Sequence, residues 1–146
     1  MRGVRLLVAT GIIAELGDLS RFDEASKLMS YVGLTPSEYS SGSHRRLSSI
    51  TKAGNSRAHR LLVEGAHSYR YPAKISREMQ MRQEGLPREV IDIAWRAQTR
   101  LCKRYVYMSK RGKNYNVIMV TIAREMIAFI WAISREVVLP DVQQRV

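Results

Sequence analysis

The side chains that could take part in catalysis or bind a ligand are concentrated in two stretches of the sequence. The first is residues 34–54, a segment dense in serine, glycine, proline and arginine. Its centre is Ser40-Ser41-Gly42, and no acidic residue lies between Glu38 and Glu64. The basic residues of this stretch are Arg45, Arg46, Lys52, Arg57 and Arg60, and His44 and His59 accompany them. Cations so close together without acidic partners are typical of a surface that binds phosphate groups. A Ser-Ser-Gly sequence by itself is typical of a turn.

A second stretch without acidic residues lies between Asp92 and Glu125. Its basic residues are Arg96, Arg100, Lys103, Arg104, Lys110, Arg111, Lys113 and Arg124. The first four are spaced so that they share one face of a helix, where like charges repel each other by roughly a few tenths of a kcal/mol per pair. Bound phosphates would relieve this repulsion, so we predict nucleic-acid contact that weakens steeply with salt. The alternative is a solvated helix face.

The remaining candidates for chemistry lack partners in the sequence. His59 and His67 could share a helix face, but no carboxylate or cysteine completes a metal site, so we expect them in the core or on the surface. Cys102 is the single cysteine, which excludes an internal disulfide and a cysteine-based metal site. Trp95 and Trp131 are expected to pack rather than to stack on bases.

The composition limits the class of protein that positions these groups. The chain has 146 residues and a net charge of +11, from 24 Lys or Arg against 13 Asp or Glu. A hydrophobic fraction of 45% with 25% charged residues predicts a folded chain, and the excess charge predicts a polyanionic partner. No apolar run approaches the roughly 20 residues of a membrane helix. Since the N-terminus also lacks a signal-peptide pattern, we expect a cytoplasmic protein without membrane contact.

The hydrophobic spacing predicts helices and no paired strands. We expect helices over residues 4–16, 24–32, 56–70, 73–84, 87–111 and 115–136. Asp23 and Asn55 are expected as N-caps, Gly33 just past a helix end, and Pro87 as a first helical residue. The predicted fold class is all-α, with five or six helices and a basic Ser/Gly/Arg loop between the second and third.

We expect a single domain over residues 1–146, because this length suits one hydrophobic core. Its parts are a helical core with the serine loop (1–70), a connector (71–86), a long basic helical hairpin (87–136) and a frayed tail (137–146) that contains Pro140.

Six blocks of the sequence have a distinctive order and spacing. They are residues 15–22 (ELGDLSRF), 31–42 (YVGLTPSEYSSG), 50–57 (ITKAGNSR), 60–66 (RLLVEGA), 82–87 (RQEGLP) and 93–98 (IAWRAQ). Together these blocks resemble the C-terminal transposase domain of the insertion-sequence 110/116/902 family, and the resemblance covers nearly the whole chain.

The resemblance implies a function that composition does not. Such transposases cut and rejoin DNA with an N-terminal RuvC-like domain, which holds divalent metal (Mg) on an Asp-Glu-Asp-Asp set, and a C-terminal domain that supplies a serine. The serine role falls on Ser40, with Ser41 as second choice. The resemblance also implies a structured guide RNA as partner besides DNA, and either homo-oligomers or association with full-length transposase.

The assigned role is chemically reasonable. A serine hydroxyl can attack a phosphodiester and hold the cut strand covalently, which conserves the bond for resealing. Arg45 and Arg46 follow closely enough to stabilise the added negative charge of the transition state. Gly42 lets the backbone approach a phosphate, and His44 could shuttle a proton.

The metal-binding part of the family has no counterpart in this sequence. Its acidic residues Asp18, Asp23, Glu24 and Asp92 belong to the domain's own structural blocks. We therefore expect no cofactor in this chain, a truncated product, and no catalysis without the metal-binding domain. The alternatives are a non-catalytic basic helical nucleic-acid-binding module and, third, a helical oligomer that associates through residues 87–136.

Overall fold

The structure is a computed structural model, which describes residues 1–41, 44–50 and 54–137, with residues 36–41 and 44–50 described by their backbone. Six α-helices form the body, as predicted. They are α1 (Leu6–Leu16), α2 (Ala25–Tyr31), α3 (Ser56–Ala66), α4 (Arg77–Gln83), α5 (Arg88–Lys110) and α6 (Tyr115–Glu136). Two short 3₁₀ helices, η1 (Leu19–Arg21) and η2 (His67–Arg70), connect them.

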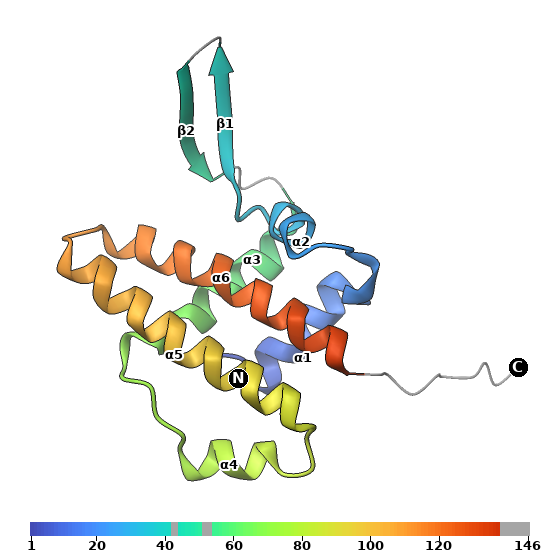
Figure 1. The fold of residues 1–146 in the computed structure, drawn as a ribbon. Coiled ribbons are helices and arrows are strands. Elements are labelled where there is room, and N and C mark those ends of the chain that lie inside the picture. Colours follow the sequence, from blue (N-terminus) through green and yellow to red (C-terminus); the bar gives the residue numbers. More distant parts are fainter. Residues whose placement is uncertain (42–43, 51–53, 138–146) are drawn as a thin grey trace, which may run out of the picture.

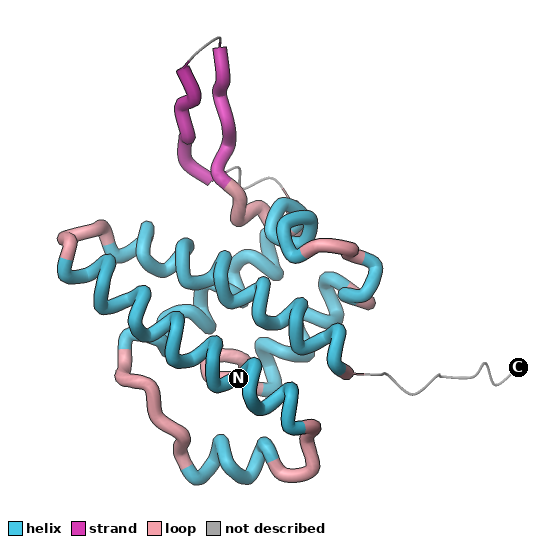
Figure 2. The backbone as a smooth tube through the Cα atoms, viewed as in Figure 1, coloured by secondary structure: helices cyan, strands magenta, loops and turns pink. Residues whose placement is uncertain are grey.

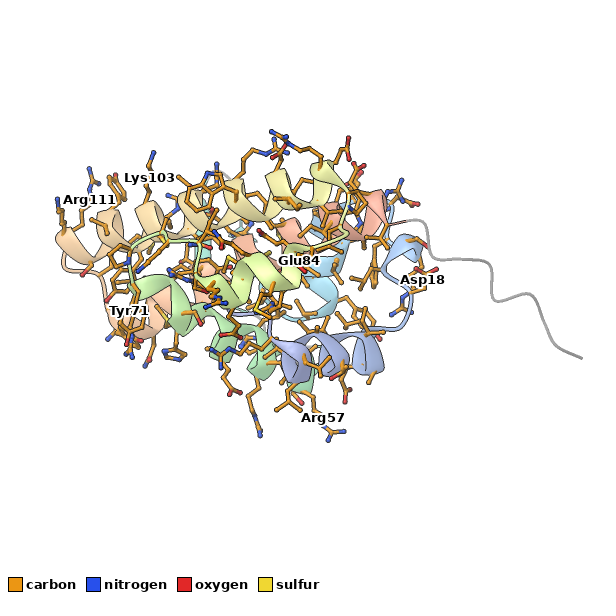
Figure 3. The ribbon with its side chains drawn as sticks, turned by 90° about the horizontal axis from the view of Figure 1, so that it is seen from below. Asp18, Arg57, Tyr71, Glu84, Lys103 and Arg111 are labelled. Atoms are coloured by element: carbon orange, nitrogen blue, oxygen red, sulfur yellow. The ribbon has the colours of Figure 1, made fainter. Side chains whose placement is uncertain are left out.

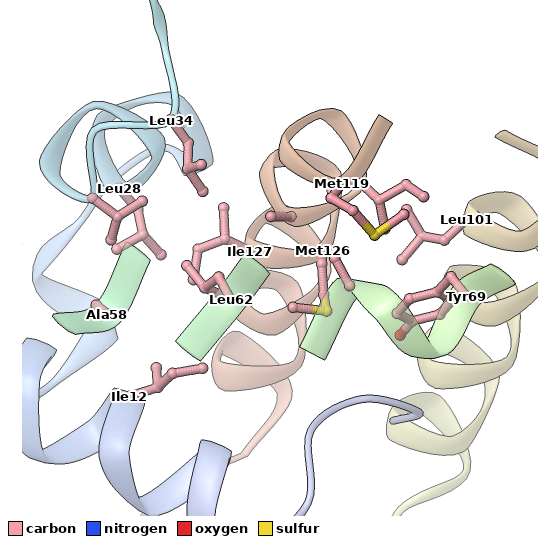
Figure 4. Packing of buried hydrophobic residues seen from close by; sticks show 14 of the residues in the cluster. Ile12, Leu28, Leu34, Ala58, Leu62, Tyr69, Leu101, Met119, Met126 and Ile127 are labelled. Atoms are coloured by element: carbon pink, nitrogen blue, oxygen red, sulfur yellow. The ribbon is translucent and has the colours of Figure 1, made fainter. Parts of the chain in front are cut away.

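Helix α6 is the centre of the helical body and contacts α2, α3, α5 and η1 (Figures 1 and 2). Its buried residues recur at helical spacing and are Ile118, Met119, Ile122, Ala123, Met126 and Ile127. They pack against Leu28, Leu62 and Leu101, from three other helices, in one apolar cluster (Figure 4). The burial of this cluster is what the amphipathic spacing of the sequence predicts.

The segment between α2 and α3 differs from the prediction. Residues expected to form a loop without paired strands instead form an antiparallel hairpin of β1 (Pro36–Ser41) and β2 (His44–Ile50). The hairpin stands away from the helical body (Figure 1). The composition misled the prediction because Ser, Pro and Gly dominate this segment and the strands lack an alternating apolar face, which is the usual sign of a strand.

Two of the four predicted helix-end signals are confirmed, Asn55 and Gly33. The Asn55 side chain accepts a hydrogen bond from the amide of Ala58 at 2.9 Å, and Gly33 has a positive φ of 69° just past α2. Asp23 is not an N-cap, because Glu24 occupies that position, and the Asp23 carboxylate pairs with Lys27 at 3.1 Å.

Other boundaries also differ from the prediction. Helix α1 begins at Leu6 instead of residue 4, and α3 ends at Ala66 instead of residue 70, because residues 67–70 form the 3₁₀ helix η2. Helix α4 begins at Arg77 instead of residue 73, because the Ser76 hydroxyl accepts from the amide of Met79. Pro87 is the residue before α5 rather than its first residue. Pro140 and the tail around it lie outside the described residues.

The two tryptophans differ in their surroundings. Trp131 packs against the core and its indole donates to the carbonyl of Phe22 at 2.8 Å, as a packing role predicts. Trp95 is 40% exposed on α5, so its packing is only partial.

By length and composition, α6 is the one described helix that could cross a membrane, which the sequence analysis did not expect. One third of its most apolar window is buried in the helical body. A central helix of a bundle has the same length and composition, so these two properties do not assign α6 to a membrane.

Truncation of the core is expected to be costly. Leu62→Ala removes a fully buried side chain of α3, so it should lower the free energy of unfolding by about 2–5 kcal/mol. Urea denaturation measures this. Leu7→Ala is the control, since Leu7 is 83% exposed on α1, and its effect should stay within roughly 0.5 kcal/mol. Equal losses in the two variants would contradict the packing described here.

Candidate serine site and nucleic-acid interface

The predicted serine lies near the far end of the hairpin. In the register of the two strands, Ser40 is the partner of Arg45, and Ser41 is the partner of His44. Tyr39 and Arg46 form the next pair toward the body. The backbone register therefore pairs Ser40 with one of the two candidate arginines, Arg45, whereas Arg46 is paired with Tyr39 and not with a serine.

The base of the hairpin is fixed to the end of α2. Leu34 is fully buried, and its amide donates to the carbonyl of Met29 at 2.9 Å. On the other side, the amide of Asn55 donates to the carbonyl of Tyr31 at 3.1 Å. The chain thus leaves and re-enters the helical body at one place, which holds the hairpin by both ends.

Gly54 makes this junction possible. Its φ of 122° is one that other residues rarely adopt, and an added Cβ atom would collide with the carbonyl oxygen of Tyr31. The sequence does not show that the backbone of Tyr31 lies against this glycine, so only the structure reveals why position 54 requires a glycine.

The start of α3 carries the next predicted basic residues. Arg57 pairs with the carboxylate of Glu15 on α1 at 3.1 Å, and the same carboxylate accepts from the Asn55 amide group at 3.1 Å. Arg60 is exposed. The negative charge of Glu15 therefore neutralises the positive charge of Arg57, and its hydrogen bond with Asn55 connects α1 to the base of the hairpin. Lys52 lies outside the described residues.

The histidines have structural partners. His59 Nδ1 lies 3.2 Å from the carbonyl oxygen of Val32, close to the hairpin base. His67 Nδ1 lies 2.6 Å from the hydroxyl of Tyr115 at the start of α6. Each of these two histidines thus has one ring nitrogen next to an oxygen of the protein itself.

Cys102 is buried and poorly suited to act as a nucleophile. Its thiol donates to the carbonyl of Tyr71 at 3.2 Å. Burial raises the pKa of the thiol, and the nearby Arg2 guanidinium only partly opposes this effect. Because the thiolate is the reactive form, the raised pKa leaves serine as the better candidate nucleophile in this chain.

The four basic residues predicted to share one face of α5 divide into two pairs. Arg100 Nε donates to one oxygen of Glu125 at 2.8 Å, and Arg104 Nε donates to the other oxygen at 2.8 Å. Arg96 and Lys103 are exposed. Helix α6 runs back along α5 and so brings an acidic residue, Glu125, to the basic face. The repulsion inferred from the sequence is partly relieved inside the molecule.

The basic side chains labelled on α3 and α5 project in different directions. Figure 3 shows Lys103 and Arg111 projecting from α5 on one side of the helical body, and Arg57 projecting from the opposite side.

Comparison with known proteins decides the family. The model of the transposase IS116/IS110/IS902 family matches residues 1–80, more than half of the chain. The chain belongs to this transposase family. The match ends at α4, so α5 and α6 lie beyond it.

Individual transposases are also similar to this chain. A putative transposase, y4qE, of Sinorhizobium fredii is 47% identical over 136 residues, which cover 93% of this chain and 35% of that protein. The transposase for insertion sequence element IS1111A of Coxiella burnetii is 36% identical over 45% of this chain and 18% of its own length.

A probable family 20 transposase of Pseudomonas aeruginosa is 29% identical over 47% of this chain and 20% of its own length. The chain thus spans about a third or less of the length of the curated transposases it matches. No solved structure matches it.

The described part of this transposase-family chain does not fit a divalent-metal centre. Across residues 1–35 and 54–137, where side chains are described, no three His, Cys, Asp or Glu residues gather. Glu15 and Glu125 are each already paired with arginine. The steps proposed below therefore use only hydroxyl and guanidinium groups of this chain.

Proposed function

We propose that this chain is the serine-bearing, DNA-binding part of an insertion-sequence transposase that cuts and rejoins DNA. The observation that carries the proposal is the pairing of Ser40 with Arg45 near the end of a hairpin fixed to the body at its base. The transposase family of residues 1–80 supports it.

In the proposed first step, the Ser40 oxygen attacks the phosphorus of a DNA phosphodiester. A bond forms between this oxygen and phosphorus, and the bond from phosphorus to one deoxyribose oxygen breaks. The hydroxyl proton ends on the departing oxygen. The second step reverses this exchange with a hydroxyl of another strand, which frees the serine, so neither step needs an outside energy source.

Arg45 is proposed to stabilise the charge that develops on the phosphate oxygens in both steps. Guanidinium groups form strong, geometrically defined hydrogen bonds to phosphate, and such groups act best where they are already in place before reaction. Ser41, whose strand partner is His44, remains the second choice of nucleophile.

The basic residues are proposed to hold the DNA around this site. Arg46, Lys52, Arg57 and Arg60 would act on the hairpin side, and Arg96, Arg100, Lys103 and Arg104 on α5. Each phosphate contact should make binding more sensitive to salt. DNA as substrate also supports a cytoplasmic location.

Other protein chains are proposed to complete the site. The projecting hairpin supports a partner that binds beside it. We further propose that the chain works with a structured guide RNA, in homo-oligomers or with full-length transposase, and that divalent metal is supplied in trans.

The test is a search for a covalent protein–DNA adduct. The chain is incubated with DNA from the element's ends and with a full-length relative whose own serine is replaced by alanine. Peptide mass spectrometry should place a phosphodiester-linked nucleotide on Ser40. An adduct located on another residue, or no adduct under these conditions, would contradict the proposed chemistry.

A second candidate function is a binding module without chemistry. The exposed basic face of α5 favours it, since this face is separate from the hairpin. In that case, DNA binding should persist with full salt dependence, and no adduct should form even with the full-length relative.

A further inference from the structure

A groove between α5 and α6 holds more cations than Arg100 and Arg104, the two that the proposed function already assigns to DNA. Its volume is about 510 Å³, and Met29 of α2 lies at one side of it. The charged side chains that line the groove are Arg100, Arg104, Arg111, Lys113, Arg124 and Glu125. Five cations against one carboxylate leave a local charge of +4, so the groove suits an anionic ligand.

Glu125 holds two of these cations in place and leaves most of their donors available. Its side chain is only 17% exposed, and its carboxylate accepts one hydrogen bond from the Nε atom of Arg100 and one from that of Arg104, each at 2.8 Å. Each guanidinium has five N–H donors. The terminal nitrogens of both arginines remain available for a second anion, with their positions set in advance.

An aromatic ring lies among the cations. Tyr107 lines the groove and is 51% exposed, and the guanidinium carbon of Arg111 lies 4.6 Å from the centre of its ring. Positive charge beside an exposed aromatic ring is the combination that binds unpaired nucleotides, because the cations hold phosphates and the ring stacks on a base.

We propose that this groove binds an unpaired stretch of a nucleic-acid strand, with its phosphates on the arginines and a base against Tyr107. The groove volume lies within the range of sites for small molecules, which suits a nucleotide rather than a double helix. A duplex would also have to unstack a base, at a cost of about a few kcal/mol, before Tyr107 could reach it.

The inference rests on the proposed function only in that the chain acts on nucleic acid. DNA and RNA single strands share the chemistry that the groove recognises, so the experiment includes both. The groove and Ser40 are tested separately, because groove binding is measured without metal, without a full-length relative and without an adduct.

The experiment measures the affinity of the whole chain for short fluorescent oligonucleotides by anisotropy. Unpaired DNA, unpaired RNA and duplex DNA are compared at several salt concentrations. Tyr107→Ala should weaken the binding of at least one unpaired strand by about 5- to 150-fold, whereas Tyr107→Phe should leave it nearly unchanged. The effect of Tyr107→Ala on the duplex should be small.

Charge variants test the phosphate contacts. Lys113→Ala and Arg124→Ala should each lower the salt dependence of binding by about one unit of slope. Arg88→Ala is the matched control on α5, because Arg88 is 86% exposed and pairs with Asp92 outside the groove. It should change the slope less than either groove variant. Circular dichroism confirms that every variant retains its helices.

Three results would overturn the proposal. They are unchanged affinity of Tyr107→Ala for both kinds of unpaired strand, equal losses for duplex and unpaired strands in that variant, and an effect of Arg88→Ala as large as that of Lys113→Ala. Whether DNA or RNA shows the larger loss with Tyr107→Ala identifies which of the two strands the groove takes.

Discussion

Replacing Ser40 by alanine is expected to abolish the covalent protein–DNA adduct and to lower strand transfer by at least about three orders of magnitude, equivalent to about 4 kcal/mol of barrier. The reason is that the hydroxyl is the proposed attacking group, and alanine has no oxygen that could attack the phosphorus. DNA binding should stay within a few-fold of wild type, because the substitution removes no charge.

Ser41→Ala is the matched control for this experiment. Ser41 is the next residue on β1 and is paired with His44, whereas Ser40 is paired with Arg45. If Ser40 is the nucleophile, Ser41→Ala should retain the adduct. The reverse pattern would assign the reaction to Ser41, and full activity in both single variants would contradict serine chemistry in this hairpin. Strand transfer and adduct formation are measured with the same DNA and the same serine-free full-length relative.

Gly54→Ala is expected to be the most damaging change at the base of the hairpin. A φ of 122° is strained for alanine by about 1–3 kcal/mol, and the new Cβ would collide with the carbonyl oxygen of Tyr31. The backbone must shift to relieve the collision, so the hairpin would leave its position. Because a displacement of about 1 Å can lower a rate by 10²-fold, adduct formation should fall by at least about that factor.

Gly112→Ala is the control that introduces backbone strain without a steric collision. Gly112 also has a positive φ, of 64°, but nothing lies within 4 Å of an added Cβ. Its substitution should lower stability by about 1 kcal/mol and leave the adduct unchanged. Urea denaturation and the adduct assay are applied to both variants. A Gly54→Ala protein with normal adduct formation would show that the hairpin does not depend on this junction.

Much of the helical body could be predicted from local sequence signals. The apolar spacing of α5 and α6, the cap at Asn55 and the glycine after α2 each depend on residues only a few positions apart. Such signals act within one or two helical turns, so they survive without knowledge of the fold. The predicted starts of two helices were wrong because another residue is the N-cap. Glu24 rather than Asp23 is the N-cap of α2, and Ser76 is the N-cap of α4, which therefore begins after residue 73.

The candidate site depends more on contacts between distant residues. Closeness along the chain correctly associated Ser40 with Arg45, but the pairing of their strands was hidden by a composition typical of loops. The tyrosine at position 107 was not identified as a functional candidate at all. Only the tertiary structure shows that its ring is half exposed, with the guanidinium of Arg111 at 4.6 Å from the ring centre.

The sequence by itself determined the helical body, the excess positive charge and, through its six blocks, the transposase family. The helices and the blocks depend on residues close together in the chain, and the charge depends on composition alone. The tertiary structure decided which of the basic side chains have an acidic partner within the protein. Folding brings Glu125 to Arg100 and Arg104, and it brings Glu15 to Arg57. These pairings join residues 21 to 42 positions apart, so they arise from how the helices pack and not from any one segment.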